Sequence, residues 1–120
     1  MSREIEAIGR LRYKLGDTDV SIEGRSIVDI SGDAFFHGRQ NIGVSEEALA
    51  TGDITTLGWA FFKNHDKTNF VEIASGSGVQ ALIRVEAGEI AGPLRLSQGA
   101  TLYAAADTAA CDLEFLLIED

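Results

Sequence analysis

The sequence is poor in the residues that form cross-links and metal sites, because its 120 residues include one cysteine, one proline and two histidines. A single cysteine excludes an internal disulfide and any zinc site built from several thiolates. Cys111 stands in "TAACDLEF", among small and apolar residues, a setting typical of a core side chain rather than a nucleophile. His37 and His65 form neither a His-x-His nor an HExxH pattern, so we expect no bound metal.

Basic charge and long apolar runs are also scarce. Nineteen acidic residues against ten basic ones give a formal net charge of −9. That charge disfavours direct binding to nucleic acid or to anionic membranes. No apolar run approaches the roughly 20 residues that would span a bilayer, and the opening "MSREIEAIGR" lacks the apolar stretch of a signal peptide. We therefore expect a protein made in the cytoplasm and not exported by an N-terminal signal.

The most regular feature is an alternation of apolar and polar residues with a period of two. It is clear in "GRLRYKL", "VQALIRV" and "DLEFLLIED", and turn residues, including many of the 13 glycines, interrupt the apolar runs. Helix evidence is confined to 44–52, where Ser45 could cap one short turn. Strands are predicted at about 4–14, 18–23, 26–31, 35–42, 57–63, 69–74, 79–86, 90–96, 101–104 and 111–119.

Many short strands at this spacing predict an all-β fold. We expect one antiparallel β-sandwich domain over 1–120, jelly-roll-like, with at most one short helical turn. Pro93 in "IAGPLRL" suits a strand start or an edge strand, because proline has no N–H to donate. The last strand is apolar on both faces in its second half, which is typical of a central strand, of one covered by another subunit, or of a chain end packed under a loop.

The stretch "WAFFKNHDKTNFVEI" (59–73) raises the question of chemistry, because His65 stands beside Asp66. A proton relay would require the pair in a cleft beside a nucleophile or a metal. A hairpin tip explains the stretch more simply, since Asn64, Asp66 and Asn69 are turn formers between two apolar arms. His37, near Asp33, is the other residue that could take part in a metal site.

Other motifs with known chemistry are missing. Neither phosphate-binding glycine motif occurs, and "GDTDV" lacks the later glycine and glutamate of a calcium loop. "AGEIAGPLRL" is similar to strands of the cupin-type sandwich, but the histidines of a cupin metal site are absent. We therefore expect no enzyme, no cofactor and no catalytic, cofactor-binding or metal-binding residues.

Four stretches of the chain occur in a characteristic order: "HGRQNIGVSEEAL" (37–49), "GDITTLGWAFFKNHDKTNFVEI" (52–73), "LIRVEAGEIAGPLRL" (82–96) and "TLYAAADTAACDLEFLLIED" (101–120). In this order they resemble small proteins encoded among the virion-structure genes of tailed bacteriophages. The residues "FFKNHDKTNFVEI" and "ADTAACDLEFLLIED" are the most specific, whereas the N-terminal "IEAIGRLRYKLGDTDVSIEG" adds only a generic hairpin.

The resemblance implies a non-enzymatic virion component whose partners are the major capsid protein or other virion proteins. It leaves open a capsid decoration (cement) protein, a neck protein and a tail protein. Decoration is favoured because the sequence shows no long anchor, stalk or flexible arm.

Three groups of residues are candidates for contacts in an assembly, and a homo-oligomer is expected. The strand face of Arg10, Arg12 and Lys14 is either a basic docking patch or simply solvated. Trp59, Phe61 and Phe62 are either core residues or interface anchors. A carbohydrate- or receptor-binding module is the alternative from a different class, with stacking on Trp59, Tyr13 and Tyr103.

Overall fold

The computed structural model describes residues 4–29, 32–97 and 100–120, and these form strands, turns and loops without any helix. The all-β prediction is confirmed. The segment 44–52, which could have held one short helical turn, instead contains the two-residue strand β4, Glu47–Ala48, which pairs with Tyr103 and Ala104. No helix in the described part of the chain is long and apolar enough to cross a membrane. The chain divides into two compact units, Met1–Ser31 and Gly32–Asp120.

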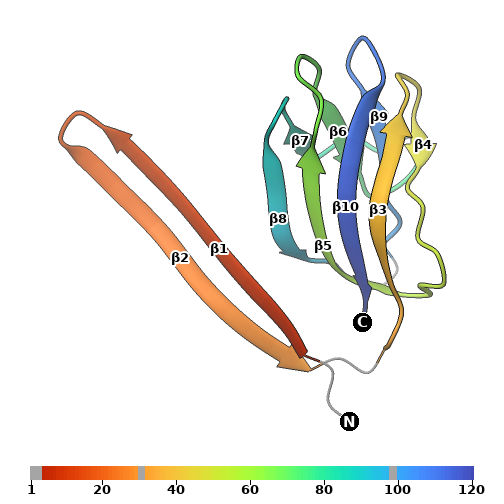
Figure 1. Cartoon of the computed structure of the whole chain (residues 1–120), viewed down its shortest axis with the longest axis horizontal. Helices are drawn as coiled ribbons and strands as arrows, with labels where there is room; N and C mark the ends of the chain where they lie inside the picture. The colour runs from red at the N-terminus through yellow and green to blue at the C-terminus, as the bar shows by residue number, and fades with distance from the viewer. Residues whose placement is uncertain (1–3, 30–31, 98–99) are drawn as a thin grey trace. The chain divides into compact units, whose positions relative to one another are not determined.

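The first unit is a long antiparallel hairpin of β1, Glu4–Leu15, and β2, Thr18–Asp29 (Figure 1). Its loop is the pair Gly16–Asp17, and only Gly16 has a positive φ, of 57°. A two-residue loop with glycine in that position matches a type II′ turn, whose twist suits the flanking strands.

The second strand of the hairpin corrects one sequence prediction. Two strands, 18–23 and 26–31, were expected with a turn between them, but β2 runs through Gly24, which pairs with Gly9. One glycine with no second turn former leaves the hydrogen-bonded ladder intact while β1 continues opposite it. Residues 30 and 31 of that prediction lie outside the described residues.

The second unit is a sandwich of two four-stranded antiparallel sheets (Figure 1). One sheet has the order β3-β10-β5-β8 and the other the order β4-β9-β6-β7. Numbered from β3 as the first strand, these orders are 1-8-3-6 and 2-7-4-5, which is the connectivity of a jelly roll. The strands not yet given are β3 Phe35–Ile42, β5 Leu57–Asn64, β6 Val71–Ala74, β7 Ile83–Val85, β8 Ile90–Arg95, β9 Tyr103–Ala106 and β10 Cys111–Glu119.

The core lies between the two sheets and centres on Phe62 and Phe115, both fully buried. Phe115 also stacks on Phe36, with 5.4 Å between ring centroids. β10 is central in its sheet, between β3 and β5, which is one of the placements that its two apolar faces indicated. Cys111 is buried, in agreement with its predicted core position. Pro93 lies in β8, an edge strand, where its missing N–H leaves no ladder bond unmade.

Candidate functional site

The two histidines of the chain meet at one carboxylate on the outer face of the β3-β10-β5-β8 sheet. His37 comes from β3, Glu114 from β10, and His65 from the residue that follows β5. His37 Nε2 lies 2.9 Å from Glu114 Oε2, and His65 Nε2 lies 2.6 Å from Glu114 Oε1. The register explains the meeting, because Leu116 pairs with His37 while Glu114 pairs with Lys63 on the other side. The Glu114 side chain, on β10, thus links β3 on one side to the end of β5 on the other.

The electrostatics of this cluster favour an ionised carboxylate. The hydrogen bonds from His65 and then from His37 lower the pKa of Glu114 to about 2. A carboxylate with so low a pKa holds no proton near neutral pH, so it is unsuited to general acid catalysis. Because both histidine Nε2 atoms are already bonded to it, the cluster acts as a clamp between strands rather than as an open metal site. Within the described residues, no three His, Cys, Asp or Glu side chains are placed to hold a metal ion.

The predicted hairpin tip at His65 and Asp66 is a turn but not a hairpin. β5 belongs to one sheet and β6 to the other, so residues 65–70 cross from sheet to sheet. Asp66 Oδ2 accepts hydrogen bonds from the backbone N–H groups of Asn69 (2.7 Å) and Thr68 (3.0 Å), which lower the pKa of Asp66. His65 therefore pairs with Glu114 while Asp66 closes the turn, and the two neighbours do not form a relay.

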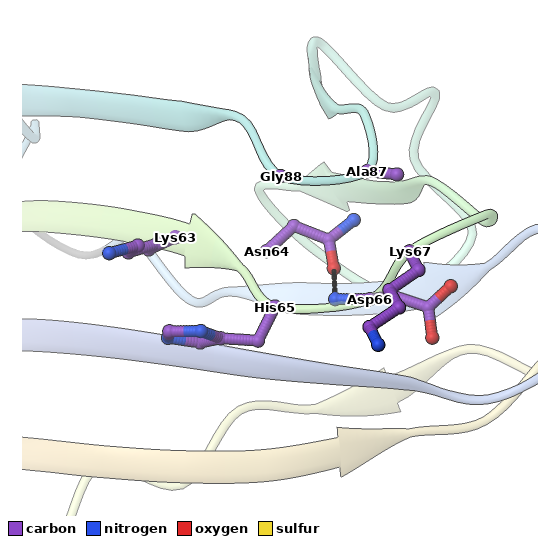
Figure 2. Close-up of a pocket in the computed structure, with 7 residues that line it drawn as sticks. All are labelled: Lys63, Asn64, His65, Asp66, Lys67, Ala87 and Gly88. Carbon is purple, nitrogen blue, oxygen red and sulfur yellow. Dashed lines mark hydrogen bonds between the residues drawn. The ribbon is translucent and has the colours of Figure 1, made fainter.

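Asn64 holds this crossing in place through its buried side chain; the sequence indicates a turn former at this position but not a buried residue. It is 1% exposed, and its amide nitrogen donates to the carbonyls of Asn69 (3.0 Å) and Val85 (2.9 Å). Its amide oxygen accepts from the backbone N–H of Asp66 at 2.9 Å, the bond dashed in Figure 2. One buried side chain thereby holds the 65–69 turn against the end of β7.

Two shallow hollows flank the histidine cluster. The first, of about 380 Å³, is lined by residues of the 65–67 turn and of the 87–88 turn, drawn in Figure 2: Lys63, Asn64, His65, Asp66, Lys67, Ala87 and Gly88. The second, of about 240 Å³, is lined by His37, Phe61, Lys63, Glu114, Phe115 and Leu116. Both are open rather than enclosed, and neither brings a nucleophile to the histidines.

The aromatic candidates divide between the two faces of β5. Phe62 is a core residue, whereas Trp59 and Phe61 are half-buried. The Arg95 guanidinium lies 5.6 Å from the centre of the Trp59 ring, and Trp59 Nε1 is buried without a hydrogen-bond partner. A sugar-binding tryptophan usually offers an accessible N–H, and the N–H of Trp59 is buried.

Seven of the 12 exposed large hydrophobic side chains among the described residues lie in the hairpin. Paired residues share a face in an antiparallel ladder, so one face holds residues 5, 7, 9, 11, 13 and 15 of β1 and their partners in β2. Five large side chains on this face are exposed, with Leu11 at 76%, Ile22 at 75% and Leu15 at 67%. We call this surface the apolar hairpin face, after its exposed side chains Leu11, Tyr13, Leu15, Val20 and Ile22.

The opposite face of the hairpin is charged and internally paired. Arg12 Nη2 lies 2.8 Å from Asp19 Oδ2, Arg25 Nη2 lies 2.7 Å from Glu6 Oε2, and Arg10 Nε lies 3.8 Å from Glu23 Oε2. The basic docking patch considered from Arg10, Arg12 and Lys14 is thus interleaved with acids from β2. The sequence of β1 alone did not show this, because the neutralising charges lie on the partner strand.

Comparison of the chain with models of known protein families, with curated proteins and with solved structures gave no match.

Proposed function

We propose that this chain is a non-enzymatic structural component of a tailed-bacteriophage virion, and that it acts as a capsid decoration protein on the outside of the major capsid shell. The proposal joins the resemblance of residues 37–120 to an observation on the hairpin. The observation is the apolar hairpin face, where five large side chains of a two-stranded sheet lie exposed. An exposed apolar surface of this kind is typical of a protein that binds neighbouring subunits in an assembly.

The chemistry of the second unit fits this role. The Glu114 clamp and the Asn64 bonds tie strands and loops of the jelly roll together. A cement protein stabilises a shell by adding buried area across subunit boundaries, and symmetry multiplies each small contact. A net charge of −9 favours docking on locally basic shell surfaces.

A neck or tail component is the second candidate, and the hairpin itself favours it. Decoration was preferred partly because the sequence shows no arm, yet β1 and β2 form 12-residue strands outside both sheets of the sandwich. At about 3.3 Å per residue, such a ribbon is roughly 40 Å long, enough to reach across a subunit boundary.

Copy number separates these candidates. Particles of the source phage would be purified on a density gradient, and peptides of this chain would be quantified by mass spectrometry against those of the major capsid protein. Decoration predicts a number of copies comparable to that of capsid subunits or capsomers. A few copies per particle would support the neck or tail instead, and absence from purified particles would contradict any virion role.

A further inference from the structure

We propose that the apolar hairpin face packs against the same face of another copy of this chain, so that the hairpins form the homo-oligomer contact. The inference rests on the proposed assembly role and deepens it by naming the surface and its partner. It is carried by three observations on the described residues: the exposure of the face, the area it offers, and the distribution of charge along the chain.

The first observation is that this face is open on both sides of the loop, where its five large side chains are exposed, although Ile5 and Ala7 at its other end are buried. A single two-stranded hairpin is marginally stable in water, and independent stability needs more strands or a packed apolar face. Here, both strands run for 12 residues with a continuous register, while Leu11, Tyr13 and Ile22 stand more than half exposed. A ribbon of this length with an open apolar side is typical of a strand pair that completes its core with a second molecule.

The second observation concerns area. Burying one large apolar side chain removes roughly 60–120 Å² of apolar surface from water, if its usual stabilising free energy is divided by about 25 cal/mol per Å². Five such side chains offer roughly 300–600 Å² per copy, or about 600–1,200 Å² for two copies, a range that includes the lower bound of about 1,000 Å² for a specific protein interface. The glycine pair Gly9–Gly24 adds an open stretch, since a Cβ built on Gly24 would meet no atom within 4 Å.

The third observation is that charge opposes contact between two sandwiches but hardly opposes contact between two hairpins. Residues 1–31 hold five basic and six acidic side chains, whereas residues 32–120 hold five basic and thirteen acidic ones. Two sandwiches therefore repel one another, while two hairpins are nearly neutral. Among positions 5–15 and 18–28, the apolar face holds no Asp, Glu, Lys or Arg, and the charged face satisfies its arginines internally. A charged partner would find no opposite charge on the apolar hairpin face. The same uncharged face of a second copy leaves no charge unpaired.

The arrangement follows from sheet packing. Two apolar sheet faces pack about 10 Å apart with interdigitated side chains, and identical surfaces meet about a rotation axis. The ion pairs of the opposite face then remain in water, where Arg12–Asp19 and Arg25–Glu6 already lie. Each hairpin uses its one apolar face in the contact. The copies therefore form a closed oligomer rather than an open chain.

The chain supplies a matched pair of variants for the test. Ile22→Glu places a carboxylate on the apolar hairpin face, where Ile22 pairs with Leu11. Ile8→Glu makes the same change on the opposite face, where Ile8 is also exposed and pairs with Arg25. Both variants alter the net charge equally and leave the buried core untouched, so a difference between them reports on the face alone.

Sedimentation equilibrium of the purified full chain and of both variants measures the contact. We expect wild type and Ile8→Glu to form the same dimer or trimer, and Ile22→Glu to weaken association by at least about tenfold. In hydrogen exchange, backbone amides of β1 and β2 should be protected in the oligomer and exchange faster in Ile22→Glu. A wild-type chain that stays monomeric, or an oligomer equally stable in both variants, would overturn the proposal.

These outcomes are independent of the virion role. A monomeric wild-type chain that is nevertheless abundant on purified particles would refute the hairpin contact and leave the proposed function standing. A hairpin-linked oligomer that is absent from particles would do the opposite.

Discussion

The side chain of Asn64 gives the sharpest quantitative prediction for the sandwich. Replacing it by alanine removes its three side-chain hydrogen bonds, to Asn69, Val85 and Asp66. The Val85 carbonyl is left in a buried site, at a cost of about 1–3 kcal/mol, and the other two bonds lose about 0.5–1.5 kcal/mol each. We therefore expect Asn64→Ala to lower the free energy of unfolding by about 2–6 kcal/mol, a large share of the stability of about 5–15 kcal/mol that is typical of such a domain.

Urea unfolding followed by the fluorescence of Trp59, the single tryptophan, measures this loss. Asn41→Ala is the matched control, because Asn41 is exposed on β3 and its replacement should change stability by less than about 0.5 kcal/mol. All samples need the same protein concentration, since association stabilises the folded chain.

A second variant separates lost hydrogen bonds from lost volume. Asn64→Asp keeps the size of the side chain but turns carboxylate oxygens toward the two carbonyls that Asn64 bonds. At neutral pH it should be at least as unstable as Asn64→Ala, and it should recover in part as falling pH protonates the acid. A loss below about 1 kcal/mol for Asn64→Ala would refute the reasoning, because it would mean that water or neighbouring groups replace the bonds.

Three further predictions concern other parts of the chain. Because the pKa of Glu114 is lowered from 4.5 to about 2, its ionised form stabilises the fold above pH 4.5, and that contribution is lost as pH falls toward 2; urea melts should therefore show the stability difference between wild type and Glu114→Gln shrinking over that window. Gly92→Ala should destabilise the sandwich by about 2 kcal/mol or more in the same assay, since φ is +128° and the new Cβ would lie 3.0 Å from the Ala60 carbonyl oxygen. Titration with glycans should leave Trp59 fluorescence unchanged, and a saturable shift would count for the carbohydrate-binding alternative and against the structural role.

The existence of most strands was predictable because the signals are local. Alternation with a period of two and turn residues at the ends mark β1 and β10 within a few residues. Strand pairing is not local, so the jelly-roll order and the passage of β2 through Gly24 were not readable. The glycine looked like a turn because its partner, Gly9, lies on another strand.

The candidate sites show the same division. His37 and Glu114 are 77 positions apart, and only the placement of β10 beside β3 and β5 brings both histidines to one carboxylate. Sequence adjacency instead drew attention to His65 and Asp66, whose side chains face different partners. A strongly alternating strand also indicates one buried face for β1, and Ile5 and Ala7 on that face are buried, whereas Leu11 on the same face is 76% exposed. Such a mismatch between pattern and burial is the signature of a surface that a partner covers.

A cryo-EM reconstruction of virions tests the proposed virion role most directly, because it would locate the chain and resolve the contacts of its hairpins. The account predicts jelly rolls distributed over the capsid shell, with the apolar hairpin faces of neighbouring copies packed together. Shells without this chain would contradict the decoration role, and hairpins whose Leu11 and Ile22 remain in solvent would contradict the contact.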